Sequence, residues 1–551
     1  MPHILQSNHV VGQWEVPTAG CLRNMPIYKI PPDALWSAHN VLVRGGFLQP
    51  RPGLTQFNVT AMSGRPTGMF NGIMLATGAF QTDAFQNDAF QTTGSIPSSL
   101  LIVGTTTKIY GYYGGVLNDI TGTPDLTALD TQLARFAGIA LGTPQTLYIL
   151  HTNGIDAPRQ WDVTSGTFSA VAGTPPLWTD IANIDAHIIG VVPPYDIRWG
   201  PTQSITSWPA ANVRVLSDTP GSLVAIRELG VRLGVVYKTD GIWDVVVTGS
   251  DVESQYFRFE QRDQVQGPAS PAAVVNADGA HLYMTKQGRV GYYDGSRHYW
   301  VAEGTWPILK LNLDSSNASR IFGAYDPRHK VALFIYPNIA GAAGDLAPAS
   351  LGDGECYGWL MVMLPNPSEG YDGFISFHGS SALPMSAGGT LRQNNEPILL
   401  ARSTSGSRRL YTWDNSSEVE SSLGFSADGD DDGSTITGHW QTGLIPCPGL
   451  EIWKLEAFET LALQRAGYGE ITVKPVSSYV LDATGGTVGS AKTVSLATSS
   501  SDKVLGKPKG ADLQGRFFGL RYEFSTLEAA SSGVARVLRW LGARLSALPG
   551  K

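Results

Sequence analysis

The sequence is short of charge, of cysteine and of long apolar runs, and each shortage excludes a class of protein. Charged residues make up 16% of the 551 residues, against roughly 25% in an average soluble protein. The three cysteines, Cys21, Cys356 and Cys447, are too few and too scattered for a disulfide framework or a zinc site. We therefore interpret them as small buried hydrophobic residues.

The sequence shows no sign of a signal peptide or of a membrane-spanning segment. The N-terminal sequence MPHILQSNHVVGQWEV lacks the basic segment and the apolar core of a signal peptide. No apolar run approaches the roughly 20 residues that a membrane span needs. We therefore expect a soluble chain, without a membrane span, that is made in a reducing cytoplasm.

Positive charge is scarce as well. The net charge is −8, and no run of Lys and Arg is longer than Arg408-Arg409. The chain thus lacks the clusters of basic residues with which nucleic-acid-binding proteins contact phosphates. A negatively charged wall repels duplex DNA, so it suits a conduit for DNA better than a clamp. The low charge density fits an assembly component with subunit interfaces, and equally a Ser/Thr/Gly-rich exposed β surface.

Turn-forming residues, by contrast, are abundant, with 63 glycines and 34 prolines. In the stretch 185–301, short apolar runs alternate with Gly, Asp and Pro turns, which is typical of strands rather than helices. Asp240-Gly241 and Asp278-Gly279 each stand between two such runs. There, glycine is expected to supply the positive φ of a hairpin turn. The pattern predicts a series of antiparallel hairpins.

The same rhythm has a period along the chain. Trp-Asp ends a strand-like run at residues 161–162, 243–244 and 413–414, and the separations are close to two and four units of about 42 residues. A unit of that length with four short strands is the size of a β-propeller blade. The chain is also too long for one ordinary core. We predict an all-β fold with a β-propeller of six to eight blades over residues 96–415.

The N-terminal residues 1–95 have a different texture. They are expected to be extended and irregular, with one strand over Asn40–Val43 that Gly45-Gly46 reverses. Residues 79–91 hold three AFQ units with phenylalanine at a period of five. We interpret these units either as an inserted loop or hairpin whose phenylalanines pack on a neighbour, or as a locally packed surface loop.

Residues 416–551 contain longer strand-like runs joined by Ser/Thr/Gly-rich connections, as in a β-sandwich. We expect them either to form a β-sandwich-like platform or to complete the propeller. The final segment 533–548 fits a helix face and a strand face equally. The strand is favoured because the surrounding segments are strands.

Few residues form a pattern that could carry chemistry. Asp428, Asp430 and Asp432 match the first half of a calcium loop, but His439 stands where a bidentate acid is needed. A solvated acidic turn is therefore the favoured interpretation, and we predict no bound metal.

Catalytic motifs are missing too. Nucleophile elbows, P-loops and the H-E-x-x-H motif are absent from the sequence. A propeller glycosidase needs paired carboxylates, and no spacing singles out the candidates Glu228, Asp263 and Glu303. We predict that the chain is not an enzyme and holds no cofactor.

The order of strand and turn signals across 185–310 resembles the propeller proteins of short-tailed phage tails. These are the tail nozzle or hub proteins, which include the packaged-DNA stabilisation proteins. The segment 34–54 and the late strand beginning at Lys454 are similar to the same family. The positions that carry the resemblance are Pro194, Trp199, Trp208, Asp240, Gly241, Gly267, Asp278, Gly279, Gly288, Asp294, Gly295 and Lys454. The AFQ repeat has no counterpart in this pattern.

The resemblance implies a structural role in the virion tail, after synthesis in the host bacterial cytoplasm. It implies a homo-hexameric ring below the portal and the adaptor, or head-to-tail connector, that extends the DNA channel. Such a ring retains packaged DNA, lets the genome pass without specific binding, and carries tail fibres, spikes or a needle. Ring closure would then fix the copy number.

Two other functions compete with this one. A carbohydrate-binding or glycoside-hydrolysing tail propeller that recognises a receptor is suggested by the 14 Trp and 20 Tyr, which could stack on sugars. Most of these aromatics lie within strand runs and are expected to be core residues. A scaffold propeller of a cellular host is the third interpretation.

Overall fold

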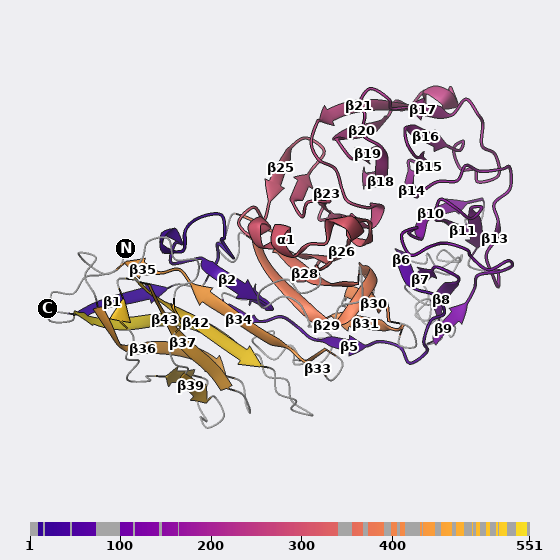
Figure 1. The fold of residues 1–551 in the computed structure, drawn as a ribbon. Helices are drawn as coiled ribbons and strands as arrows, with labels where there is room; N and C mark the ends of the chain where they lie inside the picture. The colour runs from indigo at the N-terminus through magenta and orange to yellow at the C-terminus, as the bar shows by residue number, and fades with distance from the viewer. Residues whose placement is uncertain are drawn as a thin grey trace, which may run out of the picture.

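The structure is a computed structural model, and Figure 1 shows its fold. It describes residues 9–14, 17–44, 47–72, 100–113, 116–142, 146–162, 165–339, 355–366, 373–390, 398–404, 408–413, 430–431, 434–446, 453–464, 470–478, 487–488, 492–495, 503–506, 514–515, 517–525 and 536–547. The AFQ repeat lies outside these residues, as do Asp428 and Asp432 of the candidate calcium loop.

The described part of the chain is almost entirely β-structure, which confirms the predicted all-β class. It contains one α-helix, α1 (Trp306–Asn312), and four short 3-10 helices. The latter are η1 (Ile27–Lys29), η2 (Glu253–Gln255), η3 (Pro271–Ala273) and η4 (Ser315–Arg320). Among the described residues, no helix has the length and apolar character that crossing a membrane requires.

Five four-stranded antiparallel sheets stand around a common axis as the blades of a β-propeller (Figure 1). Blade 1 consists of β6 (Pro66–Gly72), β7 (Leu100–Thr105), β8 (Ile109–Tyr113) and β9 (Val116–Asp119). Blade 2 consists of β10 (Arg135–Leu141), β11 (Thr146–Thr152), β12 (Arg159–Asp162) and β13 (Ser169–Ala170). Blade 3 consists of β14 (Asp180–Ile184), β15 (His187–Val192), β16 (Asp196–Trp199) and β17 (Val213–Val215). Blade 4 consists of β18 (Leu223–Gly230), β19 (Leu233–Lys238), β20 (Gly241–Val247) and β21 (Phe257–Asp263). Blade 5 consists of β22 (Val274–Ala277), β23 (Ala280–Met284), β24 (Val290–Tyr293) and β25 (His298–Val301).

A curled sheet, rather than a sixth separate blade, closes the ring between blades 5 and 1. Its strands are β26 (Phe322–Asp326), β27 (Val331–Pro337), β28 (Cys356–Met363), β29 (Ile375–Thr390), β30 (Ile398–Arg402) and β31 (Leu410–Trp413). Strand β26 contacts β22 of blade 5, and β29 contacts β6 of blade 1. The predicted count of six to eight blades is therefore wrong. The reason is that the long strand β29 continues past this sector into a larger sheet.

The Trp-Asp period explains part of this error. Trp161 and Trp243 occupy the third strands of blades 2 and 4, so their separation does span two blades. Trp413 belongs to β31 of the curled sheet, where it pairs with Leu54 of β5 (Leu54–Gln56). The separation between Trp243 and Trp413 therefore does not correspond to a number of blades.

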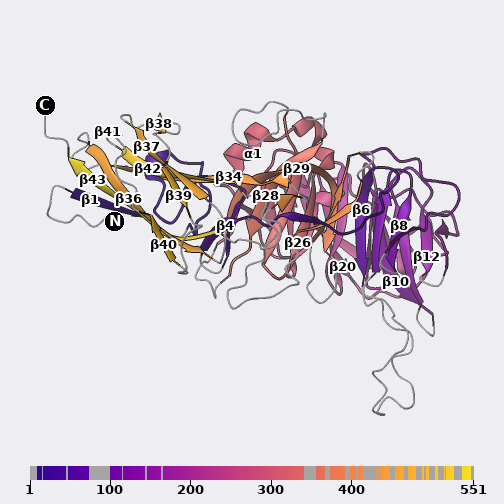
Figure 2. The same cartoon turned by 90° about the horizontal axis from the view of Figure 1, so that it is seen from below.

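The curled sheet extends without a break into the second part of the molecule (Figure 2). Together they form a sixteen-stranded sheet. Its further strands are β5, whose bounds are given above, and β2 (Leu35–His39), β32 (Asp430–Asp431), β33 (Ser434–Thr435), β34 (Thr437–Thr442), β35 (Ile445–Pro446), β37 (Glu470–Ser478), β38 (Thr487–Val488), β39 (Lys492–Ser495) and β42 (Phe517–Ser525).

A seven-stranded sheet joins the two ends of the chain. It contains β1 (His9–Trp14), β3 (Val41–Arg44), β4 (Phe47–Pro50), β36 (Trp453–Gln464), β40 (Lys503–Gly506), β41 (Gln514–Gly515) and β43 (Arg536–Ala547). Strand β1 pairs antiparallel with β43, and β3 with β4. The expectations of a strand near Asn40–Val43 that is followed by a reversal of the chain, and of a C-terminal strand, are confirmed, while Gly45 and Gly46 themselves lie outside the described residues. Asn40 itself has a φ of 57° and separates β2 from β3, which enter different sheets.

The two Asp-Gly hairpins behave differently. Ala277 pairs with Ala280, and both Asp278 (φ 49°) and Gly279 (φ 84°) have positive φ, as a two-residue turn that matches the strand twist requires. At the other hairpin, Lys238 pairs with Gly241, so the turn is Thr239-Asp240 and Gly241 already begins β20. The expected positive φ at Gly241 is wrong. Glycine is needed there because a Cβ would lie 2.8 Å from the Trp243 ring.

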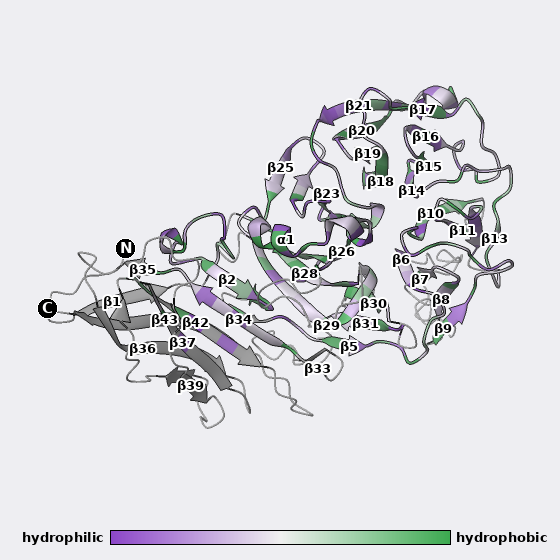
Figure 3. Ribbon diagram, in the orientation of Figure 1, coloured by the Kyte–Doolittle hydropathy of each residue, from purple (hydrophilic) through white to green (hydrophobic). Residues whose placement is uncertain are grey.

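The core lies mainly between adjacent sheets, because each blade packs both of its faces. Blades 3 and 4 share a cluster that includes Trp199, Trp243 and Phe257, and green, hydrophobic strands line these interfaces in Figure 3. Cys21 and Cys356 are buried, and burial raises the pKa of each thiol to about 12. These two cysteines are core residues, as expected, whereas Cys447 lies outside the described residues.

Close approach of neighbouring inner strands makes glycine necessary at Gly68. A Cβ at this position in β6 would overlap the backbone carbonyl oxygen of Ala134, just before β10. We predict that Gly68→Ala lowers the free energy of unfolding by about 1–3 kcal/mol, the usual cost of overpacking. Gly230 is the matched control, since a Cβ there meets nothing within 4 Å. Urea denaturation of both variants tests this, and equal stabilities would contradict it.

Candidate functional site in the propeller channel

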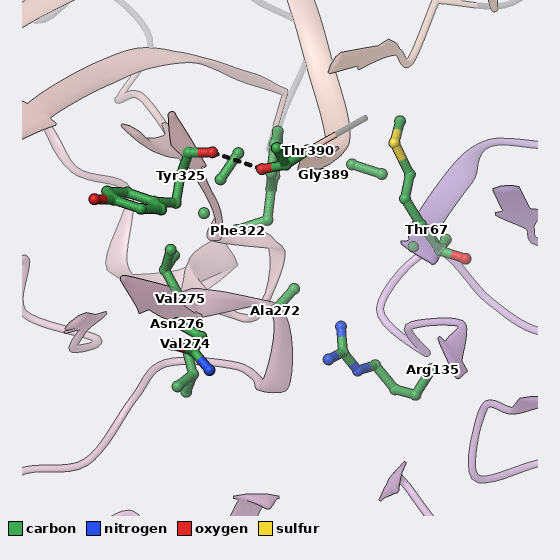
Figure 4. A pocket seen from close by; sticks show the side chains of 16 residues that line it. Thr67, Arg135, Ala272, Val274, Val275, Asn276, Phe322, Tyr325, Gly389 and Thr390 are labelled. Atoms are coloured by element: carbon green, nitrogen blue, oxygen red, sulfur yellow. Dashed lines mark hydrogen bonds between the residues drawn. The ribbon is translucent and has the colours of Figure 1, made fainter. Parts of the chain in front are cut away.

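A cavity of about 200 Å³ lies where the first strands of the blades face the axis of the propeller (Figure 4). It is lined by residues of β6, β10, β22, β26 and β29 together with Ala272 of η3. Much of the wall is small or apolar, including Met69, Val275 and Phe322. Arg135 is the one charged residue among those that line it.

Behind this wall, a buried charge cluster links three consecutive blades. Asp180, the first residue of β14, has a fully buried side chain and lies between two arginines. Its Oδ1 accepts from Nε of Arg135 at 2.7 Å, and its Oδ2 accepts from Nη1 of Arg227. The backbone N–H of Ile226 also donates to Oδ2, at 2.9 Å. One carboxylate therefore ties β10 and β18 to β14.

The cluster continues to blade 5. Nη2 of Arg227 donates to the carbonyl oxygen of Pro271 in η3, directly before β22. Burial, and then the like charge of Arg135, lowers the pKa of the Arg227 guanidinium to about 10. The guanidinium stays protonated at neutral pH, so two cations share one anion.

A second network braces the other side of the ring. Arg65, just before β6, lies 3.0 Å from Oε1 of Glu355 and 3.6 Å from Oδ2 of Asp130. Nη2 of Arg320 in η4 donates to the same Asp130 oxygen at 2.6 Å. This network links blade 1, the connection before blade 2 and the closing sector, with two cations matched by two anions.

The remaining blade junctions are held by neutral hydrogen bonds. The backbone N–H of Ala134 donates to Oγ1 of Thr67 at 3.3 Å, between blades 1 and 2. Oγ of Ser270 donates to the carbonyl oxygen of Ile321 at 2.5 Å, between blade 5 and the closing sector. The inner polar groups thus mostly serve to join neighbouring sheets.

The carboxylates considered for glycoside hydrolysis do not meet in this cavity. Glu228 lies in β18, Asp263 ends β21 near Nδ1 of His298 at 3.3 Å, and Glu303 follows β25 at 3.8 Å from Nε of Arg289. None of the three lines the cavity. The two carboxylates flanking a glycosidic bond lie within about 10 Å of each other, and no carboxylate contributes to this wall.

The candidate calcium loop gains no support from the described residues. Asp430 forms the short strand β32 with Asp431 and pairs with β33. Within the described ranges, no three His, Cys, Asp or Glu residues are grouped so that they could hold a metal ion.

The aromatic residues are mostly core residues. Of the eleven tryptophans whose side chains are described, eight are buried and the other three are half-buried. Trp199 is buried and its Nε1 donates to the carbonyl oxygen of Glu253 at 2.9 Å. The half-buried Trp208 packs edge-on against Trp178, 4.9 Å between ring centroids.

The other positions that carry the family resemblance shape turns and close contacts. Asp240 accepts hydrogen bonds from Oγ1 of Thr219 at 3.1 Å and from the backbone of Gly221 at 2.8 Å. A Cβ at Gly267 would overlap the carbonyl oxygen of Lys238. The carbonyl oxygen of Pro194 accepts from Leu223 at 2.9 Å, which joins blades 3 and 4.

In blade 5, two turns depend on glycine in the left-handed region. Gly288 has a φ of 81° and Gly295 a φ of 89°. Oδ1 of Asp294 accepts from the backbone N–H of Ser296 and of Arg297, which fixes the second turn. Lys454 lies in β36, outside the residues whose side chains are described.

Sequence reasoning did not identify Arg135, Asp180 and Arg227. These residues come from three strands about 45 positions apart and form no local motif. The available signal was a charged residue in or at the start of a strand that is otherwise apolar, as in DIANI and LVAIRELG.

His151 in β11 is a buried titratable group outside these networks. Its ring lies 5.2 Å from Phe136 and 6.3 Å from Phe168, and neither ring nitrogen has a hydrogen-bond partner. Burial, helped by the charge of Arg159, lowers its pKa to about 3. The ring is therefore neutral and behaves as an aromatic core residue.

Asp180 is predicted to be essential for stability. Asp180→Asn would leave two buried guanidiniums without their shared anion, which costs about 3–5 kcal/mol in comparable sites. The control is Asp196→Asn, since Asp196 pairs with Arg198 at a partly exposed position where pairs contribute about 0–1 kcal/mol. Denaturation midpoints measure both effects. Similar losses in the two variants would show that the cluster does not brace the blades.

His151 is predicted to weaken the fold in acid. Its folded pKa lies below its unfolded value, so the unfolded chain binds more protons and stability falls as the pH drops from about 6.5 towards 3. His151→Phe should reduce the slope of stability against pH by up to about 1.4 kcal/mol per pH unit. Melting temperatures between pH 7 and pH 4 test this. An unchanged slope would show that His151 is not neutral and buried.

The comparisons with known proteins concern the fold alone. No protein-family model matches the chain, and no curated protein matches it in sequence. Among solved structures, the WD40 β-propeller domain of Doa1 is 7% identical, with 65% of this chain and 95% of that chain covered and a TM-score of 0.32. BamB from Moraxella catarrhalis is 10% identical, with 65% and 99% covered and a TM-score of 0.31. The SapL1 lectin in complex with alpha methyl fucoside is 13% identical, with 52% and 95% covered and a TM-score of 0.30.

Proposed function

We propose that this chain is a structural subunit of a nozzle or hub ring in a short-tailed phage tail. In this role it extends the DNA channel below the portal and the adaptor, retains packaged DNA, and anchors fibres, spikes or a needle. The proposal rests first on the resemblance of strand and turn order across residues 185–310. The observation in the structure that supports it best is that the inner polar groups brace the blades.

A catalytic propeller keeps reactive side chains in its channel, whereas the charged side chains near this channel join neighbouring sheets. Asp180 forms ion pairs with Arg135 and Arg227. Asp130 forms ion pairs with Arg65 and Arg320. Both carboxylates hold neighbouring sheets together, and neither of them lines the cavity. A rigid, non-enzymatic body is the function that such an arrangement favours.

The two-part architecture also suits a ring subunit. The sixteen-stranded sheet carries hydrogen bonds from the propeller into the second part, so a hinge between them would break backbone pairing. In a ring, each subunit meets its neighbours through two different surfaces, and their fixed relative angle decides how many copies close it. A stiff subunit keeps that angle constant.

One end of the propeller is a candidate contact surface for neighbouring copies. Exposed leucines lie in the connections that precede the inner strands, namely Leu129 before β10, Leu177 before β14 and Leu311 before β26. Successive inner strands of an even-stranded propeller run in the same direction, so these connections share one end. Apolar groups gathered on one face are typical of protein interfaces.

The net charge of −8 agrees with a wall that DNA passes without specific binding. The partners proposed are five further copies of the chain, the adaptor above, and the fibre, spike or needle proteins. The genome passes through the DNA channel of the ring, and the mature protein resides in the virion tail.

The purified chain, alone or mixed with its adaptor, is predicted to form closed rings. Six chains of 59.0 kDa give about 350 kDa, which mass photometry measures directly, and negative-stain images should show sixfold top views. A chain that stays monomeric with and without the adaptor, and that is absent from purified virions, would contradict the proposal.

A pair of variants locates the contact surface. Leu311→Glu places a charge on the proposed face, where the leucine is 75% exposed, and should shift the mass distribution towards single chains. Val231→Glu is the control, because Val231 is 80% exposed in the turn between β18 and β19 at the opposite end. Loss of rings in the control alone would reverse the assignment of the face.

A further inference from the structure

We propose that the seam between the propeller and the second part of the molecule is an acid-sensitive joint. The seam is the place where β2 lies between β29 of the closing sector and β34 of the second part. In acid, protonation of the histidines at the seam releases β2 from β29 and loosens the connection between the two parts. The joint is separate from ring assembly and does not depend on the proposed function.

One histidine from each of the three strands stands in a single row across the seam. His39 of β2 pairs in register with His378 of β29 on one side and with His439 of β34 on the other. Residues paired in register point to the same face of a sheet, and the His39 ring lies 5.5 and 5.9 Å from the two neighbouring rings, between centroids. All three residues are at most 4% exposed. Within the described part of the sheet, His39 and His378 form the one register pair between β2 and β29.

Asn40, next to His39, ties the strands of the seam together. Its Oδ1 accepts from the backbone N–H of Ser380 in β29 at 3.0 Å and from Nε of Arg51 at 2.9 Å. These two donors fix the orientation of the carboxamide. Its Nδ2 donates to the carbonyl oxygen of Thr437 in β34 at 2.8 Å, and it lies 3.3 Å from Nε2 of His39.

This contact requires His39 to be neutral. The amide nitrogen of Asn40 is a donor only, so the Nε2 atom of His39 that faces it acts as the acceptor and carries no proton. A proton added at Nε2 would point at another donor and push the amide away from its partners in β29 and β34. Protonation of His39 is therefore coupled to the side chain that links the three strands.

Charged side chains near the row are mostly cations, so they oppose a further positive charge. The one acid, Glu523, pairs in register with His439 but is bound by Lys474 at 2.6 Å and by Arg521 at 3.0 Å. The charged side chains around the row are Arg23 ahead of β2, Arg51 after β4, Arg521 and Glu523 of β42, and Lys474 of β37.

The pKa values agree with this geometry. Burial, and then the neighbouring imidazoles and Arg23, holds the pKa of His378 well below its usual range. Burial, and then the charge of Arg521, does the same to the pKa of His439. In an opened seam a hydrated histidine has a pKa of about 6.5, so the open form binds more protons than the closed one. The closed seam is thus most stable above about pH 6.5, and each such histidine weakens it about tenfold per pH unit below that.

The position of the row separates it from the other buried histidines. His151 in β11 and His281 in β23 stand singly, and each of these strands pairs with its neighbour through four or more residues. Opening the sheet at either place breaks a whole ladder of backbone hydrogen bonds, whereas β2 is joined to β29 by one register pair. Acid should therefore act on the seam before it acts on the blades.

Hydrogen–deuterium exchange of the full chain at pH 7.0 and pH 5.0 tests the joint, with rates corrected for the intrinsic pH dependence of exchange. Peptides from β2, from β29 around His378 and from β34 report on the seam. Peptides from β7 and β8 of blade 1, which contain no histidine, report on the propeller. We expect the seam to exchange at least twentyfold faster at pH 5.0, since each histidine that ionises on opening contributes roughly thirtyfold. Blade 1 should change less than threefold.

Two variants isolate the row. His378→Phe keeps a ring of similar size at a position where Nδ1 has no hydrogen-bond partner within the described residues, and it should reduce the acid response of the seam at least fivefold. His439→Gln, whose amide can keep the 3.0 Å contact with Oγ of Ser37, should do the same and guards against misfolding of the first variant. His151→Phe is the matched control, because it removes an equally buried histidine from blade 2 and should leave the response unchanged.

Several results would overturn the proposal. Equal acceleration of the seam and of blade 1 at pH 5.0 would show that acid acts on the whole fold. An unchanged exchange rate at the seam would show that it does not open in acid. A full acid response in both His378→Phe and His439→Gln would exclude the histidine row as its origin, and so would equal reductions in His378→Phe and His151→Phe.

Discussion

Closing a ring of sheets requires the first strand of each blade to approach its neighbours closely without leaving buried charges or backbone groups unpaired. The propeller meets the steric part of this requirement with small residues such as Gly68, whose missing Cβ makes room for the carbonyl of Ala134. It meets the polar part with Asp180, which accepts from side chains and backbone of two adjacent blades. Apolar side chains fill the space between neighbouring blades, as in the cluster that blades 3 and 4 share.

The same requirement decides what the channel can do. Asp180 is fully buried, both of its oxygens accept hydrogen bonds from arginines, and it does not line the cavity. An acidic residue at an inner position can serve either stability or catalysis. In this chain the acidic residue between the two arginines serves stability. Arg135, which helps to brace three strands through one anion, is also the one charged residue among those that line the cavity.

Local patterns in the sequence predicted the local structure well. The alternation of apolar runs and turns gave antiparallel hairpins, and Asp278-Gly279 forms the expected turn because both residues have positive φ. Gly241 shows the limit of this reasoning. The dipeptide has the right composition, but pairing of Lys238 with Gly241 places the turn one residue earlier, and the glycine serves the Trp243 ring instead. Register depends on contacts across the sheet that no dipeptide contains.

The features that sequence reasoning missed depend on long-range contacts. Arg135, Asp180 and Arg227 come into contact only when three blades have folded together. Their spacing along the sequence therefore does not predict the contact. The blade count failed for a related reason, since Trp413 lies in a strand that pairs with Leu54 near the other end of the chain. A period read along the chain cannot reveal that one sector of a ring belongs to another sheet.

The closing sector has a mechanical consequence that a sixth separate blade would not have. Strand β29 pairs with β28 and β30 in the propeller, and His378 within it pairs with His39 of β2, which leads through β34 to β42. Relative motion of the propeller and the second part would therefore have to break ladder hydrogen bonds in a buried sheet, rather than bend a linker. At this junction the His39 ring lies tilted against that of His378 at 5.5 Å and stacked on that of His439 at 5.9 Å between centroids. Burial holds the pKa values of His378 and His439 well below their usual range. His378 and His439 are therefore neutral at pH 7, and the backbone pairing of His39 with His378 links the two parts of the molecule.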